Sequence, residues 1–269
     1  PIYQDKETWT GYRVGVEAAK ERYGADQVYP INELHEQLPQ YLEKADRLYY
    51  HLGRDLAFNQ KILTHWQRLL ATYPKRGTGP IAIEDSKLLV QTMRRVKLPE
   101  ELERIRRAIA ISVKAHNQAR EMTQPGLYEY EIQAEMERIF RIEGGSGPAY
   151  PSIIASGPNA CILHYIDNTR SMQEDDVLLI DAGCAYAYYN ADITRTFPVG
   201  GQFTPEQRIL YELVLEAQLK AIEQVQPGKP FNQFHDAATR VITEGLVDLG
   251  LLKGDVNQLI EDKKHKAFF

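Results

Sequence analysis

Apolar residues recur along the first part of the chain at the spacings of helices and strands. Helical periodicity covers residues 33–42 and resumes from about residue 53 to residue 70. Arg47–Leu52 lies between these helices and has the character of a short strand. Alternating helices and strands predict an α/β domain over residues 1–80, which ends in the turn-rich stretch 73–80. Residues 81–97 are then expected to form a linker.

The rest of the chain, residues 98–269, predicts a second domain of helices around a sheet. Helical spacing runs from Pro99 to about residue 142, and helical sequence returns over residues 205–250. Between them, short apolar runs predict strands at residues 152–155, 176–180 and 193–199. Both helical stretches are interrupted by Gln-Pro-Gly, at residues 124–126 and 226–228. This echo suggests a duplicated helix–turn–helix unit.

Composition and charge exclude several classes of protein. The 269 residues are 43% hydrophobic and 26% charged, which is typical of a globular chain rather than a disordered or fibrous one. The net charge of −5, with the basic run at residues 104–107 set among glutamates, argues against a nucleic-acid partner. No apolar stretch approaches the roughly 20 residues that span a bilayer. Two cysteines are too few for a disulfide framework, so we expect a cytoplasmic protein with no membrane partner.

Two aspartates carry the sharpest chemical signal. Asp181 ends a buried apolar strand, and Asp192 begins the next strand. A hairpin that turns near Tyr186–Ala187 would bring their carboxylates face to face, roughly 4.5–5.5 Å apart at Cβ. Two carboxylates at such a short distance repel one another unless a cation lies between them, so the pair predicts a divalent metal site. The alternative is that both aspartates cap turns in an unrelated α+β fold.

Other candidate groups are weaker. His164 lies in an apolar run, residues 160–165, which predicts a strand; there it is either a core residue or a group that lines a pocket. Cys161 and Cys184 occupy similar apolar contexts, where structural cysteine is commoner than nucleophilic cysteine. The chain lacks a phosphate-binding glycine loop and a Gly-x-Ser-x-Gly elbow.

Several motifs together resemble the Xaa-Pro aminopeptidase (aminopeptidase P) family of pita-bread metallopeptidases. They are KLPEELERIRRA from Lys97, ACILHY around His164, LLIDAGC through Asp181 and ADITRTFPVGG around Asp192. The resemblance implies an α+β protein: part of an N-terminal α/β domain, then an incomplete pita-bread domain, a curved antiparallel sheet flanked by helices. It also implies hydrolysis of the N-terminal Xaa-Pro bond through a hydroxide that bridges two Mn²⁺ ions.

The resemblance assigns roles to individual residues. Asp181 resembles the bidentate ligand of one metal and Asp192 the carboxylate that bridges both. His164 resembles the group that steadies the scissile region and its oxyanion, and Thr194 a residue that hydrogen-bonds the Asp192 carboxylate. Trp9 and Arg76 resemble N-terminal residues that reach the active site of a neighbouring subunit. The implied partners are a peptide with proline in second position and further copies of the chain, as a dimer or tetramer.

The family pattern also requires one histidine and two glutamates that would follow residue 269. Because Pro1 is not Met and the chain ends on Ala-Phe-Phe, we expect a piece of a longer protein, cut at one or both ends. The isolated piece is expected to bind Mn²⁺ weakly or not at all and to be inactive alone. Two further interpretations stay open: a prolidase that acts on Xaa-Pro dipeptides, and a pita-bread module that binds peptides or proteins without catalysis.

Overall fold

The computed structural model describes residues 7–9 and 11–268, which fold into two compact units that meet in sequence at Lys97 and Leu98. The elements of the first unit are α2 (Gly15–Tyr23), η1 (Ile31–Glu33), α3 (Leu34–Leu42), β1 (Arg47–Tyr49), α4 (Leu56–Arg76), β2 (Ala82–Glu84) and α5 (Ser86–Arg95). The strands β1 and β2 pair in parallel, with Leu48 opposite Ile83. Such a pairing requires a crossover, which α4 supplies.

The predicted linker differs from the structure. Residues 81–97 hold β2 and α5, and the turn-rich stretch from residue 73 begins inside α4. Pro74 lies in the last turn of this helix, which ends where Gly77 adopts a left-handed conformation and donates its N–H to the Tyr73 carbonyl at 2.8 Å. Pairing with β1 recruits the segment after residue 80 into the first unit, a long-range contact that local turn propensity does not report.

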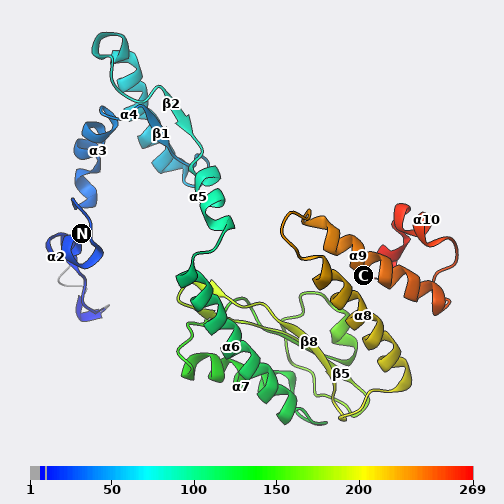
Figure 1. The fold of residues 1–269 in the computed structure, drawn as a ribbon. Helices are drawn as coiled ribbons and strands as arrows, with labels where there is room; N and C mark the ends of the chain where they lie inside the picture. The colour runs from blue at the N-terminus through cyan, green and yellow to red at the C-terminus, as the bar shows by residue number, and fades with distance from the viewer. Residues whose placement is uncertain (1–6, 10, 269) are drawn as a thin grey trace. The chain divides into compact units, whose positions relative to one another are not determined.

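The second unit contains the helices and strands around which the candidate site is built (Figure 1). Its elements are α6 (Pro99–Met122), α7 (Glu129–Ile142), β3 (Gly147–Pro148), β4 (Ile153–Ser156), η2 (Gly157–Cys161), β5 (Val177–Asp181), β6 (Cys184–Tyr186), β7 (Tyr189–Asn190), β8 (Thr194–Pro198), α8 (Pro205–Gln224), α9 (Asn232–Asp248), α10 (Val256–Glu261) and η3 (Lys264–Ala267). Two antiparallel sheets have the strand orders β3-β6-β7 and β4-β5-β8.

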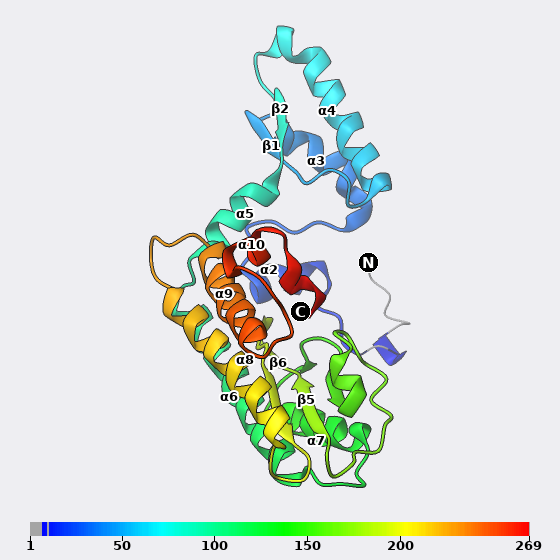
Figure 2. The same cartoon turned by 90° about the vertical axis from the view of Figure 1, so that its right-hand side faces the viewer.

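The core of this unit lies where α6 and α7 cover the strands, as seen from the side in Figure 2. Each helix contributes a stripe of residues three or four apart, and alternate residues of β5 point into the same cluster. The buried members include Ile111, Ala115, Ala119, Ile132, Met136, Phe140, Ile154, Leu178 and Ile180. The helix–sheet packing therefore holds β5, the strand that ends at Asp181.

The Gln-Pro-Gly echo is confirmed as a structural repeat. Gly126 follows α6 with a φ of 89° and Gly228 follows α8 with a φ of 84°, and each turn leads into another helix. In both turns the N–H after the glycine donates to the glutamine carbonyl three residues earlier. Proline followed by a left-handed glycine is the pattern of a type II turn.

Within the described residues, no helix is both long and apolar enough to cross a bilayer.

Candidate functional site

The candidate site lies where β5 passes into β6 and the chain returns toward β8. The strands β6 and β7 turn at Ala187 and Tyr188, both at positive φ (47° and 69°), as a type I′ hairpin requires. The same register continues through β5 and β8, where Asp181 pairs with Thr194. The hairpin thus turns one residue later than expected, without the Asn-Gly that usually marks such a turn.

The register places Asp181, Asp192 and Thr194 on one face of this ribbon. Thr194 lies directly opposite Asp181, and Asp192 lies two residues before Thr194 on the same strand path. The two aspartates are therefore diagonal neighbours. The sequence had suggested a directly opposed pair instead. Asp181 is half-buried and Asp192 is exposed.

Tyr150 joins the two carboxylates. Its hydroxyl lies 2.6 Å from Asp181 Oδ1 and 3.2 Å from Asp192 Oδ1, so these oxygens are no more than about 6 Å apart. Burial, together with the two acidic neighbours, raises the pKa of Tyr150, so the phenol keeps its proton. One proton cannot satisfy two carboxylates at full strength. Tyr150 was not predicted as a site residue, because a tyrosine 31 residues before Asp181 carries no local signal in the sequence.

This donor set fits part of a divalent metal centre. Two converging carboxylates and a phenol oxygen are oxygen donors of the kind that Mn²⁺ accepts. Among the described residues, however, no group of three or more His, Cys, Asp or Glu side chains is placed to hold a metal. Asp181 and Asp192 could thus supply two ligands of a site that needs others.

The predicted strand around His164 is wrong. Residues 157–161 form the short helix η2, and the chain then turns, which leaves His164 exposed in a loop. Gly157 begins this turn at a φ of 52°, and Pro158 cannot donate to a strand ladder. Cys161 is likewise exposed in η2 rather than in a strand. Cys184, in contrast, is buried in β6, and burial raises the pKa of its thiol.

Trp9 and Arg76 belong to the first unit. Trp9 is largely exposed, and Arg76, in the last turn of α4, pairs with Glu43.

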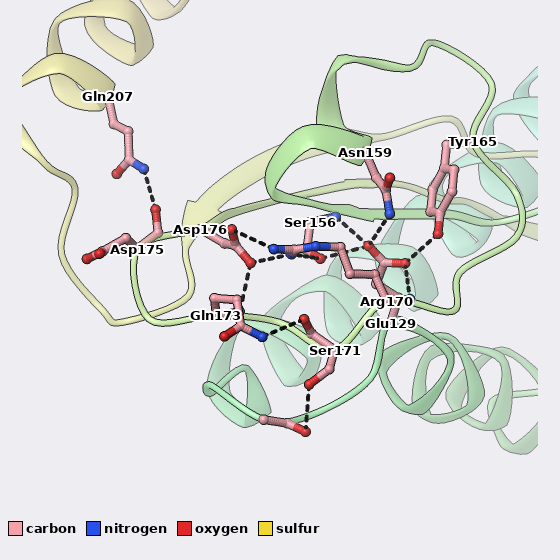
Figure 3. A network of polar contacts seen from close by, with 11 residues as sticks. Glu129, Ser156, Asn159, Tyr165, Arg170, Ser171, Gln173, Asp175, Asp176 and Gln207 are labelled. Atoms are coloured by element: carbon pink, nitrogen blue, oxygen red, sulfur yellow. Dashed lines mark hydrogen bonds and ion pairs between the residues drawn. The ribbon is translucent and has the colours of Figure 1, made fainter.

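A second polar cluster surrounds Glu129, the first residue of α7 (Figure 3). This carboxylate is fully buried and accepts from Ser156 N and Oγ, both at 2.7 Å, from Tyr165 Oη at 2.8 Å and from Arg170 N at 2.9 Å. Burial alone would raise the pKa of Glu129, but these hydrogen bonds outweigh burial, and the pKa is lowered. Arg170 also pairs with Asp176 at the start of β5.

The Glu129 cluster orders the segment that carries His164. Its donors come from β4, from the loop after η2 and from Arg170, so one carboxylate anchors both ends of residues 156–170. This cluster was not predicted from the sequence, because its members are up to 41 residues apart.

Comparisons with known proteins agree with this architecture. The model of metallopeptidase family M24 matches residues 103–266, and that of the aminopeptidase P N-terminal domain matches residues 1–50. The chain is 38% identical over 263 residues to an Xaa-Pro aminopeptidase of Escherichia coli and 39% identical over 267 residues to one of Haemophilus influenzae. It covers 60% and 59% of these relatives, and each alignment includes 98% of this chain.

Solved structures extend the likeness to the fold. Aminopeptidase PepP of Pseudomonas aeruginosa superimposes with a TM-score of 0.91 at 42% identity, over 98% of this chain and 60% of its own. Zinc-substituted aminopeptidase P of E. coli, in complex with product, gives 0.92 at 38% identity, over 100% of this chain and 61% of its own. These matches confirm the expected fold. The chain is a member of metallopeptidase family M24, with an N-terminal part that matches the aminopeptidase P N-terminal domain.

Proposed function

We propose that this chain forms part of a metal-dependent aminopeptidase that removes the N-terminal residue of peptides with proline in second position. The observation that carries the proposal is the convergence of Asp181 and Asp192 on one hydroxyl, in a chain 38% identical to an Xaa-Pro aminopeptidase. Since the chain spans about three-fifths of that relative, the remaining ligands would come from outside these residues.

In this proposal Asp181 and Asp192 hold a pair of divalent metal ions, with Mn²⁺ as the expected ion. When bound, such ions polarise the scissile carbonyl and lower the pKa of water. Tyr150 keeps the two carboxylates at a fixed separation. Thr194 lies opposite Asp181, on the same face as Asp192, and is proposed to hydrogen-bond the Asp192 carboxylate. His164 is proposed to donate a hydrogen bond to the oxyanion that develops on the substrate.

The substrate chemistry sets a further requirement. The Xaa-Pro bond has no amide hydrogen, so a site for this substrate cannot use that group as a hydrogen-bond donor. Trp9 and Arg76 are proposed substrate contacts supplied to a neighbouring subunit, which would make the active enzyme a dimer or tetramer. We also propose a cytoplasmic location and little activity for residues 1–269 alone.

The test measures hydrolysis of an Xaa-Pro-Xaa tripeptide and an Xaa-Pro dipeptide by the intact protein with Mn²⁺. D181N and D192N should each lower kcat/KM by more than about 100-fold, because a metal ligand is lost. D175N is the matched control, since Asp175 is exposed and its backbone carbonyl, not its carboxylate, accepts from Gln207. Cleavage of the dipeptide alone would indicate a prolidase, and no cleavage of either peptide would indicate a binding module.

A further inference from the structure

Helix α6 reaches the candidate site through two side chains that no motif marks. His116 Nε2 lies 2.9 Å from the Ala182 carbonyl oxygen, and Ser112 Oγ accepts from Cys184 N at 2.9 Å. His116 and Ser112 are four residues apart, so they occupy one face of the helix. They therefore contact the backbone on both sides of Gly183, in the segment that joins β5 to β6.

Both side chains are buried, and both hydrogen-bond to this backbone. His116 is 6% exposed and Ser112 is fully buried. Because a carbonyl oxygen only accepts, His116 Nε2 carries the proton of the bond to Ala182. His116 Nδ1 is buried and has no hydrogen-bond partner in the described part of the chain. The hydrogen bond from His116 Nε2 to Ala182 holds the peptide next to Asp181.

The segment that these residues hold has very little room. A Cβ on Gly183 would lie 1.8 Å from the Ala191 carbonyl oxygen and 3.1 Å from Asp192 N. The backbone of Ala191 and Asp192 therefore packs directly against Gly183 in the paired strand, and Ala182 N donates to Ile193 O at 3.2 Å beside this contact. Any shift of the Ala182–Cys184 backbone would move the Asp192 strand as well.

We propose that His116 and Ser112 are positioning residues, which fix the backbone of residues 182–184 from α6 and thereby set the separation of the Asp181 and Asp192 carboxylates. The role in metal binding rests on the proposed function above, whereas the geometric role does not. The helix supplies hydrogen-bond partners for the Ala182 carbonyl and the Cys184 N–H, beside the backbone pairing that this segment makes with Ile193 and Ala191. A purely structural role would contribute stability alone.

The experiment compares three substitutions of His116 in the intact protein, with Mn²⁺ alone as the probe and calorimetry as the measurement. H116Q can place an amide N–H near the original Nε2, H116N places one near Nδ1, and H116L has no donor. We expect H116N and H116L to weaken Mn²⁺ affinity by about 10- to 100-fold, and H116Q to restore most of it. S112A should give a smaller loss in the same direction.

The matched control is H65L in the first unit. His65 is also buried and hydrogen-bonded, to His35 Nδ1 at 3.1 Å, so its loss should lower stability without changing Mn²⁺ affinity. Equal Mn²⁺ affinity in wild type, H116N and H116L, with lowered stability, would overturn the proposal. The contrast between H116Q and H116N keeps the test open even if H116L does not fold.

A structural readout separates this proposal from the proposed function. Crystal structures of wild type and H116N should show that the Tyr150 hydroxyl contacts both carboxylates in wild type and loses at least one contact in the variant. Unchanged contacts would overturn the positioning role, whatever the enzyme cleaves. If the wild type binds Mn²⁺ but cleaves neither peptide, the aminopeptidase activity is rejected. The positioning role is then decided by the Mn²⁺ affinities and by the Tyr150 contacts of the variants.

Discussion

At the scale of single residues, the convergence of the two aspartates depends on Gly183. Its side-chain hydrogen faces the backbone of Ala191, and no larger residue fits without moving one strand. Backbone yields less readily than the end of a flexible side chain. The glycine therefore permits the close approach of the two paired strands that brings Asp192 beside Asp181.

G183A should separate the strands and disturb the site. We expect a loss of about 2–4 kcal/mol in the free energy of unfolding, by overpacking against the backbone, together with lost Mn²⁺ affinity. Urea denaturation and calorimetry measure the two effects. The control is G245A in α9, where the nearest atoms to the new Cβ belong to the Leu213 side chain, which can change its rotamer. Similar losses in both variants would contradict the special role of Gly183.

Tyr150 gives a second prediction at this scale. Y150F removes the hydroxyl shared by Asp181 and Asp192, and the free energy of unfolding without metal should fall by about 1–3 kcal/mol because a charged acceptor loses its donor. Added Mn²⁺ should recover part of this loss in the intact protein, since a cation compensates the two carboxylates. Y189F is the control: the hydroxyl of Tyr189 in β7 donates to Glu101 of α6 at 2.7 Å, and the loss of stability in this variant should not respond to Mn²⁺.

At the scale of elements, buried polar side chains join pieces that the hydrophobic pattern leaves separate. Glu129 ties the N-terminus of α7 to β4 and to the loop that carries His164. The position also suits a carboxylate because the N-terminal end of a helix favours negative charge. A buried charge with several donors defines one arrangement of these elements and penalises others.

E129Q should lower the free energy of unfolding by about 3 kcal/mol near neutral pH, because the amide places a donor among groups that already donate. The lowered pKa of Glu129 makes its contribution fully present above pH 4.5, the ordinary value for glutamate, and the contribution is lost as pH falls through the folded-state value. Denaturation of wild type should therefore show a steeper loss of stability below pH 4.5 than E129Q shows.

E135Q supplies the control for that comparison. Glu135 pairs with Arg138 one turn along the surface of α7, and Arg138 is largely exposed. Such a pair contributes at most about 1 kcal/mol. A pH profile of E129Q that matches wild type would show that the buried carboxylate does not contribute in the charged form.

At the scale of the whole molecule, the chain consists of two units, and each has its own buried apolar residues. Ile62 and Leu69 of α4 are buried in the first unit, and the α6–α7 cluster forms the core of the second. Between α5 and α6, residues 96–98 have no regular structure and are exposed. This short connection is the natural place for the chain to be cut.

Brief trypsin treatment should cleave first after Lys97, because the bond is exposed and lies outside both helices. Mass spectrometry should then find two resistant products that end and begin at this bond. K97Q removes the cleavage site and serves as the control, so the same early products from K97Q would place the susceptible bond elsewhere. First cleavage inside α6 or α7 would contradict the two-unit organisation.

Local patterns in the sequence determined much of this fold. The spacing of apolar residues located α3, α4, α6, α7 and the strands β4, β5 and β8, because burial of one face imposes a period of 3.6 or 2 on the sequence. Pro99 and the glutamates after it marked the start of α6, and the two Gln-Pro-Gly turns marked its repeat. Asp181 and Asp192 stood out because a charge at the end of an apolar strand is itself a local signal.

Tertiary structure decided what lies far apart in the chain. Contacts between residues at least 27 positions apart decided the pairing of β2 with β1 and the loop conformation of His164. The contacts of Tyr150, His116 and Glu129 are of the same long-range kind. The side chains of Tyr150, His116 and Glu129 carry no periodic signal, since they act through hydrogen bonds to distant groups. The sequence alone thus determined most of the long helices, the strands β4, β5 and β8 and which carboxylates are notable, because those signals are local. Packing decided the remaining elements and the groups that hold the carboxylates in place, because those contacts are long-range.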